Sequence, residues 1–104
     1  MPRGWEPRFA TSEAAKGWEE LRRVAAGATG EAWTALTERP ARPHDPARQH
    51  RLHGRLAERE VGGRRLPQWQ YELAGGGRIW YCPDVERRVV WVVAAAPVHP
   101  TVRG

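Results

Sequence analysis

The sequence predicts an α+β fold in which a helical hairpin packs on one face of a mainly antiparallel sheet of four to five strands. Two features of the pattern indicate this class. Apolar residues recur at helical spacing over roughly the first 40 positions, whereas later they alternate with polar residues as in half-buried strands. The chain has 104 residues, enough for one core and too few for a second, so we expect a single domain over residues 1–104.

A first helix is predicted over residues 11–26, after a short extended piece at residues 5–9. Thr11 or Ser12 offers the hydroxyl of an N-cap, and Glu13 places an acid in the first turn. Apolar residues then recur at steps of four, three and four positions, which places them on one stripe of the helix: Ala14, Trp18, Leu21 and Ala25.

A shorter second helix follows, with Gly27 expected to end the first helix and Thr29 and Gly30 to begin the second. Pro40 ends it, because a proline interrupts the helical hydrogen bonds. Three prolines between positions 39 and 49 then predict a stiff, irregular connector: Pro40, Pro43 and Pro46.

Four strands are predicted after the connector. Three of them alternate apolar and polar residues, at 52–56, 68–73 and 78–82, and the fourth, at 89–95, is apolar throughout. An unbroken apolar run is typical of a central strand covered on both faces. Turns are expected at the glycines of positions 62–63 and 75–77 and at Pro83 with Asp84.

The composition limits the partners and the environment. A net charge of +5 favours a polyanion such as nucleic acid, or an acidic protein. Cys82 is the only cysteine, which excludes an internal disulfide and a zinc site built on several thiolates, and fits a reduced cytoplasm. We find neither a signal peptide nor an apolar run near the roughly 20 residues of a membrane span, so we expect a soluble cytoplasmic protein with no membrane partner.

Four segments carry a resemblance to a known family. They are RLHGRL at 51–56, with the form Leu-x-Gly-x-Leu, QWQYEL at 68–73, GGGRIWY at 75–81, and VVWVVAAAPVHP at 89–100. In this order, after a short strand and a helical hairpin, they resemble the RelE/ParE toxin superfamily over nearly the whole chain.

The resemblance implies the toxin of a type II toxin–antitoxin pair. In the RelE-like branch this is a ribosome-dependent endoribonuclease that cuts mRNA, with a cognate antitoxin, the ribosome and mRNA as partners, DNA contacted only through the antitoxin, and neither cofactor nor metal. The ParE-like branch shares the fold but poisons DNA gyrase. A non-enzymatic binding protein, whether gyrase poison or degenerate toxin, is therefore the alternative, since fold alone does not decide activity.

Cleavage of RNA without a metal needs a base for the 2′-hydroxyl proton, a cation for the phosphate oxygens and an acid for the leaving 5′-oxygen. By the resemblance, Arg78 is the phosphate-binding arginine, and its planar guanidinium fits two phosphate oxygens. His99 stands where related nucleases place a catalytic histidine or tyrosine, and His50 stands near the position of a carboxylate base. A plain surface arginine, a tail histidine and a loop histidine are the alternatives at these positions.

Four further residues are candidates for RNA binding. His53 and Arg55 fall on the polar face of the predicted 52–56 strand, where some relatives use lysines, and Arg51 precedes them. Trp80 shares the parity of Arg78 and is either a stacking surface for an unstacked base or a core residue. The residues that alternate with these along the strands are expected to face the helices: Trp69, Tyr71, Ile79 and Tyr81.

Overall fold

The computed structural model describes residues 4–97. Its elements, in chain order, are β1 (Glu6–Phe9), α1 (Ser12–Val24), α2 (Ala26–Glu38), β2 (Gln49–Arg51), the 3₁₀ helix η1 (Gly54–Leu56), β3 (Glu58–Val61), β4 (Arg64–Pro67), β5 (Trp69–Glu72), β6 (Arg78–Asp84) and β7 (Val89–Ala96).

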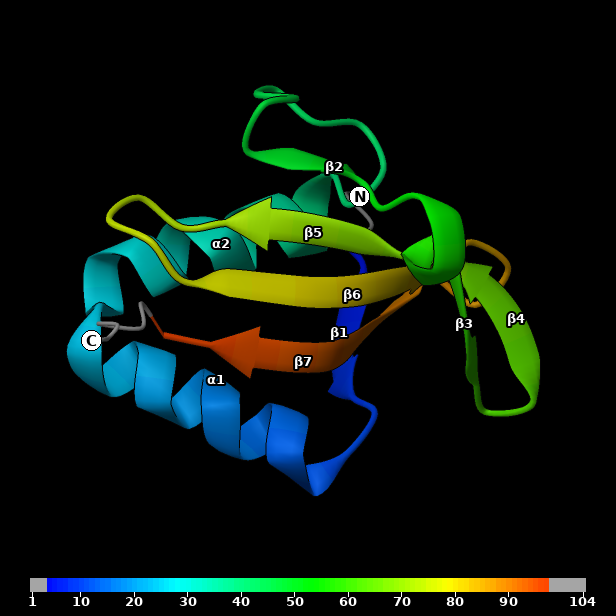
Figure 1. Ribbon diagram of the computed structural model, residues 1–104, viewed down its shortest axis with the longest axis horizontal. Coiled ribbons are helices and arrows are strands. Elements are labelled where there is room, and N and C mark those ends of the chain that lie inside the picture. Colours follow the sequence, from blue (N-terminus) through cyan, green and yellow to red (C-terminus); the bar gives the residue numbers. More distant parts are fainter. Residues whose placement is uncertain (1–3, 98–104) are drawn as a thin grey trace.

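The main sheet has five strands in the order β1-β7-β6-β5-β2, and β3 and β4 form a separate two-stranded hairpin. Only the β1–β7 pair of the main sheet is parallel. Both helices pack on one face: in Figure 1, α2 lies behind β5 and β6, and α1 runs beside β7. The predicted α+β class, with a helical hairpin on one face of a mainly antiparallel sheet, is confirmed.

The first helix follows the predicted pattern. The hydroxyl oxygen of Thr11 accepts a hydrogen bond from the backbone N–H of Ala14 at 3.0 Å, so Thr11 is the N-cap. Trp18 and Leu21 are buried on the predicted stripe. The helix also approaches β7 very closely at Gly17, where a Cβ atom would lie 2.0 Å from the carbonyl oxygen of Ala95.

The break between the helices differs from the prediction. Ala25, with φ −149° and ψ 59°, is the C-cap of α1 and also the N-cap of α2. Its N–H donates to the carbonyl of Leu21 at 2.8 Å, and its own carbonyl accepts from the N–H of Thr29 at 2.9 Å. One residue thus ends one helix and begins the next, which places Gly27 in the first turn of α2 rather than at the end of α1.

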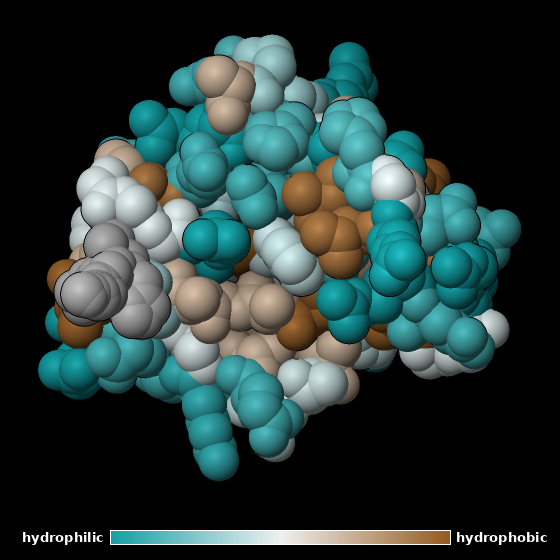
Figure 2. Space-filling model, viewed as in Figure 1, coloured by the Kyte–Doolittle hydropathy of each residue, from teal (hydrophilic) through white to brown (hydrophobic). Residues whose placement is uncertain are grey.

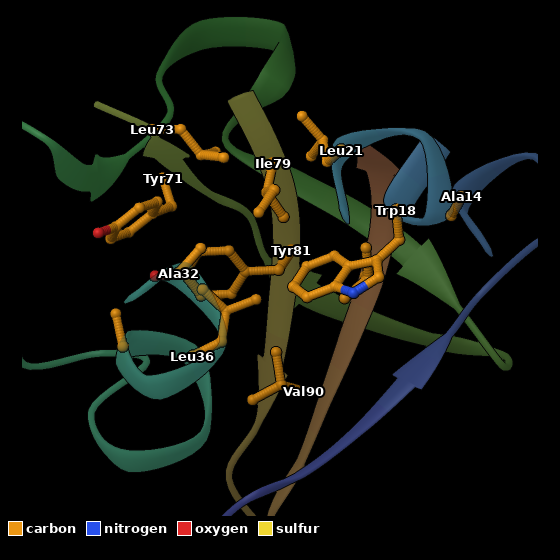
Figure 3. Packing of buried hydrophobic residues seen from close by; sticks show 12 residues of the cluster. Ala14, Trp18, Leu21, Ala32, Leu36, Tyr71, Leu73, Ile79, Tyr81 and Val90 are labelled. Atoms are coloured by element: carbon orange, nitrogen blue, oxygen red, sulfur yellow. The ribbon is translucent and has the colours of Figure 1, made fainter. Parts of the chain in front are cut away.

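The core lies between the helices and the sheet, and Figure 3 shows its packing. Ile79 and Tyr81 of β6 are fully buried there, with Tyr71 of β5 beside them. Trp69 is half-buried and stacks on Tyr81, with ring centroids 6.4 Å apart. The predicted helix-covered face of β5 and β6 is confirmed.

The Leu-x-Gly-x-Leu segment is not a strand, contrary to the prediction. The strand β2 occupies Gln49–Arg51, and Gly54 then takes a φ of +65°, which turns the chain into η1. Leu56 is consequently 39% exposed instead of facing the core.

Two strands that the sequence did not predict, β3 and β4, follow η1 and meet at the glycine turn of positions 62–63. Each contributes a single buried apolar side chain, Val61 and Leu66, so neither shows a clear alternation. These side chains pack on Cys82 and Trp91. The hairpin therefore covers one end of the sheet face opposite the helices.

The turn between β6 and β7 also lies later than predicted, because Pro83 and Asp84 belong to β6. The turn occupies residues 85–88, where Arg88 has a φ of 58°. A side-chain oxygen of Asp84 accepts from the backbone N–H of Arg87 at 3.3 Å, as is typical of a turn-initiating aspartate. The strand β7 lies between β1 and β6, so it is central as predicted. It is not covered on both faces along its whole length, because the hairpin covers only Trp91 and Val93, and Ala94 and Ala96 line a hollow.

Candidate functional site

The candidate site lies on the part of the sheet that neither the helices nor the β3–β4 hairpin covers, which we call the open face. Strand pairing gives its residues: His50 pairs with Gln70, Gln70 with Trp80, and Trp80 with Ala94. Directly paired residues of antiparallel strands project to the same side. These four residues therefore form one row across β2, β5, β6 and β7.

A second row, two residues further along, consists of Glu72, Arg78 and Ala96. A hollow of about 810 Å³ opens over this end of the sheet. Figure 2 shows the open face from the same side as Figure 1, with weakly apolar side chains in its middle and hydrophilic ones around them. Among the residues that line the hollow are Arg48, Glu72, Arg78, Trp80, Ala94 and Ala96.

Arg78 begins β6 directly after three glycines, whose φ angles of 89°, 103° and 85° only glycine adopts readily. Its side chain is exposed and has no hydrogen bond or ion pair with any of residues 4–97. Arg48, at the same hollow, is instead held: it donates to the carbonyl of Glu72 at 3.1 Å and lies 3.7 Å from Asp45. Arg78 is thus the guanidinium that is free to bind a ligand here.

Trp80 lies on the open face and not in the core beneath the helices. Its neighbours Ile79 and Tyr81 are buried on the helix side, whereas Trp80 is half-buried and lines the hollow. Its indole N–H donates to the side-chain oxygen of Gln70 at 2.8 Å. This bond holds the nitrogen edge of the ring toward β5, and the ring contributes an apolar surface to the lining of the hollow.

His50 faces the same side because β2 is anchored through its neighbour. The side-chain nitrogen of Gln49 donates to the hydroxyl of Tyr81 at 2.8 Å and to the carbonyl of Arg39 at 3.1 Å. The Tyr81 hydroxyl in turn donates to the carbonyl of Pro40 at 2.7 Å, and burial raises the pKa of this phenol. With Gln49 fixed in the core, His50 projects to the opposite side.

The imidazole of His50 has one occupied nitrogen and one free nitrogen. Its Nδ1 lies 3.2 Å from the carbonyl oxygen of Arg51. Because a carbonyl can only accept, this contact favours the tautomer with the proton on Nδ1 and leaves the lone pair of Nε2 available. From the strand spacing and the rise per residue, the Cα atoms of His50 and Arg78 are about 12 Å apart, a distance that two long side chains can bridge with a nucleotide between them.

The other candidates lie elsewhere. Arg51 is next to His50 on β2 and so projects to the opposite side of the sheet, and its guanidinium donates to the carbonyl of Ala57 at 3.2 Å. His53 and Arg55 are exposed at η1, away from the hollow, because the segment is a turn and not a strand. His99 lies outside the described residues. The structure therefore places Arg78, Trp80 and His50 on one face of the sheet, with Arg78 and Trp80 lining the hollow and His50 outside its lining, and it separates Arg51, His53 and Arg55 from them.

Two residues of this face were missed in the sequence. Arg48 belongs to the proline-rich connector, whose path no periodicity predicts. Gln70 had a signal, since alternation along β5 places it opposite the core residues Trp69 and Tyr71, but its contact with Trp80 depends on the strand register.

Nucleophilic chemistry at the cysteine is disfavoured. Burial raises the pKa of the Cys82 thiol to about 11, so the thiolate is scarce near neutral pH. Among residues 4–97, no three His, Cys, Asp or Glu side chains gather into a group that could hold a metal ion. None of the helices in this part of the chain is long and apolar enough to cross a membrane.

No family model, curated protein or solved structure matches the chain. Function is therefore inferred from the residues of the chain itself.

Proposed function

We propose that the chain is a RelE-like toxin of a type II toxin–antitoxin pair, a cytoplasmic endoribonuclease that cuts mRNA on the ribosome. The observation that carries the proposal is the open face, where the unpaired guanidinium of Arg78 lies two residues from the half-buried indole of Trp80. A free cation beside a flat apolar ring is the combination that single-stranded nucleic acid needs, one group for a phosphate and one for a base.

In this proposal Arg78 binds the scissile phosphate through two guanidinium nitrogens and stabilises the negative charge that develops there. Trp80 stacks on a neighbouring base. The positive net charge of the chain supports association with RNA. Arg48, whose guanidinium donates to the backbone carbonyl of Glu72 and lies 3.7 Å from Asp45, is a second cation at the rim of the hollow, with its charge partly balanced by that carboxylate.

His50 is the proposed general base, since its Nε2 has a free lone pair on the same face. It removes the proton of the ribose 2′-hydroxyl, the 2′-oxygen attacks phosphorus, and the bond to the 5′-oxygen breaks. The leaving oxygen takes a proton from a general acid, and we assign this role to His99, which stands where the resemblance places a catalytic histidine or tyrosine. The products are a 2′,3′-cyclic phosphate and a free 5′-hydroxyl.

One observation favours a second function, binding without cleavage. Within residues 4–97, the open face carries one imidazole, His50. Glu72 also lies on this face, directly opposite Arg78 in the strand register, although their side chains form no ion pair. A face with one proton-transfer group suits a degenerate toxin or a gyrase poison of the same fold. The two functions share the binding surface and differ in whether RNA is cut.

The test is primer extension on an mRNA translated in vitro with the purified protein. We expect the wild type to produce cleavage bands, and Arg78→Ala, His50→Gln and His99→Gln each to weaken them by roughly a hundredfold or more, the usual scale for losing a charge-stabilising or proton-transfer group. Arg23→Ala is the matched control, because this exposed arginine lies on α1, on the far side of the sheet.

Bands of wild-type intensity from a folded Arg78→Ala protein would remove Arg78 from the site. A wild type that binds RNA and leaves it uncut would favour the non-enzymatic function. If the two histidine variants cut normally, the chemistry belongs to neither imidazole.

A further inference from the structure

Arg48 extends the second row of the open face beyond Glu72. The pairing of β2 with β5 sets Gln49 opposite Tyr71. The preceding residue, Arg48, therefore lies opposite Glu72, whose backbone N–H donates to the carbonyl of Arg48 at 2.8 Å. Glu72 in turn lies opposite Arg78, and all three residues line the hollow. The row thus carries a cation, an anion and a second cation across three neighbouring segments of the sheet.

The guanidinium of Arg48 is held on one side and free on the other. Its Nη1 donates to the carbonyl of Glu72 at 3.1 Å, and its Nε lies 3.7 Å from a carboxylate oxygen of Asp45. Its second terminal nitrogen, Nη2, forms no hydrogen bond with any of residues 4–97. An oriented guanidinium therefore presents the two N–H donors of Nη2 at the rim of the hollow.

The distribution of charge along this row decides how many anions it suits. The Cα atoms of Arg48 and Arg78 are about 10 Å apart, because two strand spacings separate them. Glu72 lies midway, and its carboxylate has no hydrogen bond or ion pair among residues 4–97. This carboxylate repels a phosphate placed midway between the arginines. The row therefore favours two anions, one at each arginine, over one anion shared by both.

We propose that Arg48 binds a second phosphate of the RNA, next along the strand to the phosphate that Arg78 binds. This inference rests on the proposed function, because it requires RNA on the open face. The RNA backbone then crosses from β6 over β5 toward the residue that precedes β2, and a base of the same segment can reach Trp80 in the neighbouring row. A phosphate contact of this kind positions the strand without reading its base sequence.

The experiment measures the affinity of labelled hexauridylate by fluorescence anisotropy at several salt concentrations. For single strands, the logarithm of the binding constant falls with the logarithm of the salt concentration by about 0.7 per phosphate that the protein neutralises. We expect Arg48→Gln to reduce this slope by about 0.7, which corresponds to roughly fivefold weaker binding at about 0.1 M salt. Arg78→Gln should have the same effect, and the double variant should reduce the slope by about 1.4.

Two further variants support this comparison. Arg23→Gln is the matched control, because it removes an exposed arginine of α1 on the far side of the sheet, and it should leave the slope unchanged. Asp45→Asn tests the subsite while keeping Arg48. Asparagine retains the side-chain oxygen that accepts from the backbone N–H of Ala47 but removes the charge beside Arg48, so hexauridylate should bind more tightly.

An unchanged slope in Arg48→Gln, together with a reduced slope in Arg78→Gln, would overturn the inference and leave the proposed function standing. A double variant with the slope of either single variant would mean that both arginines hold one phosphate, which would also overturn it. Unchanged affinity in Asp45→Asn, or a slope reduced equally by Arg23→Gln, would contradict a subsite at Arg48. Failure of hexauridylate to bind the wild type would overturn the proposed function and, with it, this inference.

Discussion

The close contact between α1 and β7 makes Gly17 the position where one methyl group should do most damage. A Cβ atom there would lie 2.0 Å from the carbonyl oxygen of Ala95 and 3.0 Å from its carbonyl carbon. Both atoms belong to the backbone of β7, so no side-chain rotation relieves the clash. The helix must move by about 1.5 Å to restore ordinary contact, and this displaces Trp18 and Leu21 from the core.

We expect Gly17→Ala to lower the free energy of unfolding by up to about 2 kcal/mol. Overpacking of a core, with the backbone shift that it forces, costs about 1–3 kcal/mol, while the better helix propensity of alanine returns about 1 kcal/mol. For a chain of this size the loss corresponds to a fall in the melting temperature on the order of 10 °C.

Gly30→Ala is the matched control, because nothing lies within 4 Å of a Cβ atom at Gly30, which is also helical. Alanine should stabilise α2 there by up to about 1 kcal/mol. Urea unfolding followed by circular dichroism measures both variants. Equal stability of Gly17→Ala and Gly30→Ala would refute the packing of α1 directly against the backbone of β7.

Three further predictions concern two buried side chains of β6, Tyr81 and Cys82. Tyr81→Phe removes the hydroxyl that donates to Pro40 and accepts from Gln49. It should lower the free energy of unfolding by about 1–3 kcal/mol in the same urea assay. An unchanged unfolding midpoint would show that these two hydrogen bonds do not stabilise the fold. Cys82 should resist a thiol reagent at pH 8 until the protein unfolds, because burial raises its pKa to about 11. The folded thiol also keeps its proton at a pH where the unfolded one has lost it, so stability should fall as the pH rises from about 9 to about 11. A flat profile over this range, or rapid labelling of the folded protein, would contradict the burial of Cys82.

The spacing of apolar residues was sufficient to predict which side of the helices and strands faces the core. The stripe through Trp18 and Leu21 and the alternation around Ile79 and Tyr81 each follow a single period, so the buried side of α1 and β6 could be predicted. The positions that failed depend on single backbone conformations. The break between α1 and α2 falls at Ala25, and an alanine gives no local signal of a helix end.

For the candidate site, the sequence could predict only which residues share a face within a single strand. Arg78 and Trp80 share a face by alternation within β6. The relation of His50 to them depends on where β2 begins, because a shift of one residue moves every side chain to the other face. With β2 at Gln49–Arg51, His50 joins the open face and Arg51 leaves it. The turn at η1, which removes two further candidates, begins at Gly54 with a φ of +65° and is held by a hydrogen bond from the side chain of Gln68 to the carbonyl of Leu56, a contact that alternation does not predict.

Mapping where RNA contacts the protein tests the proposed RNA-binding face most directly. Ultraviolet crosslinking of a single-stranded RNA oligomer to the wild-type protein, with mass spectrometry of the adducts, reports this face without any substitution. We predict adducts within residues 70–80, above all at Trp80, which is accessible at the hollow. Adducts confined to the exposed aromatic residues of the opposite side, Phe9 and Trp33, would contradict the assignment of the open face as the RNA-binding surface.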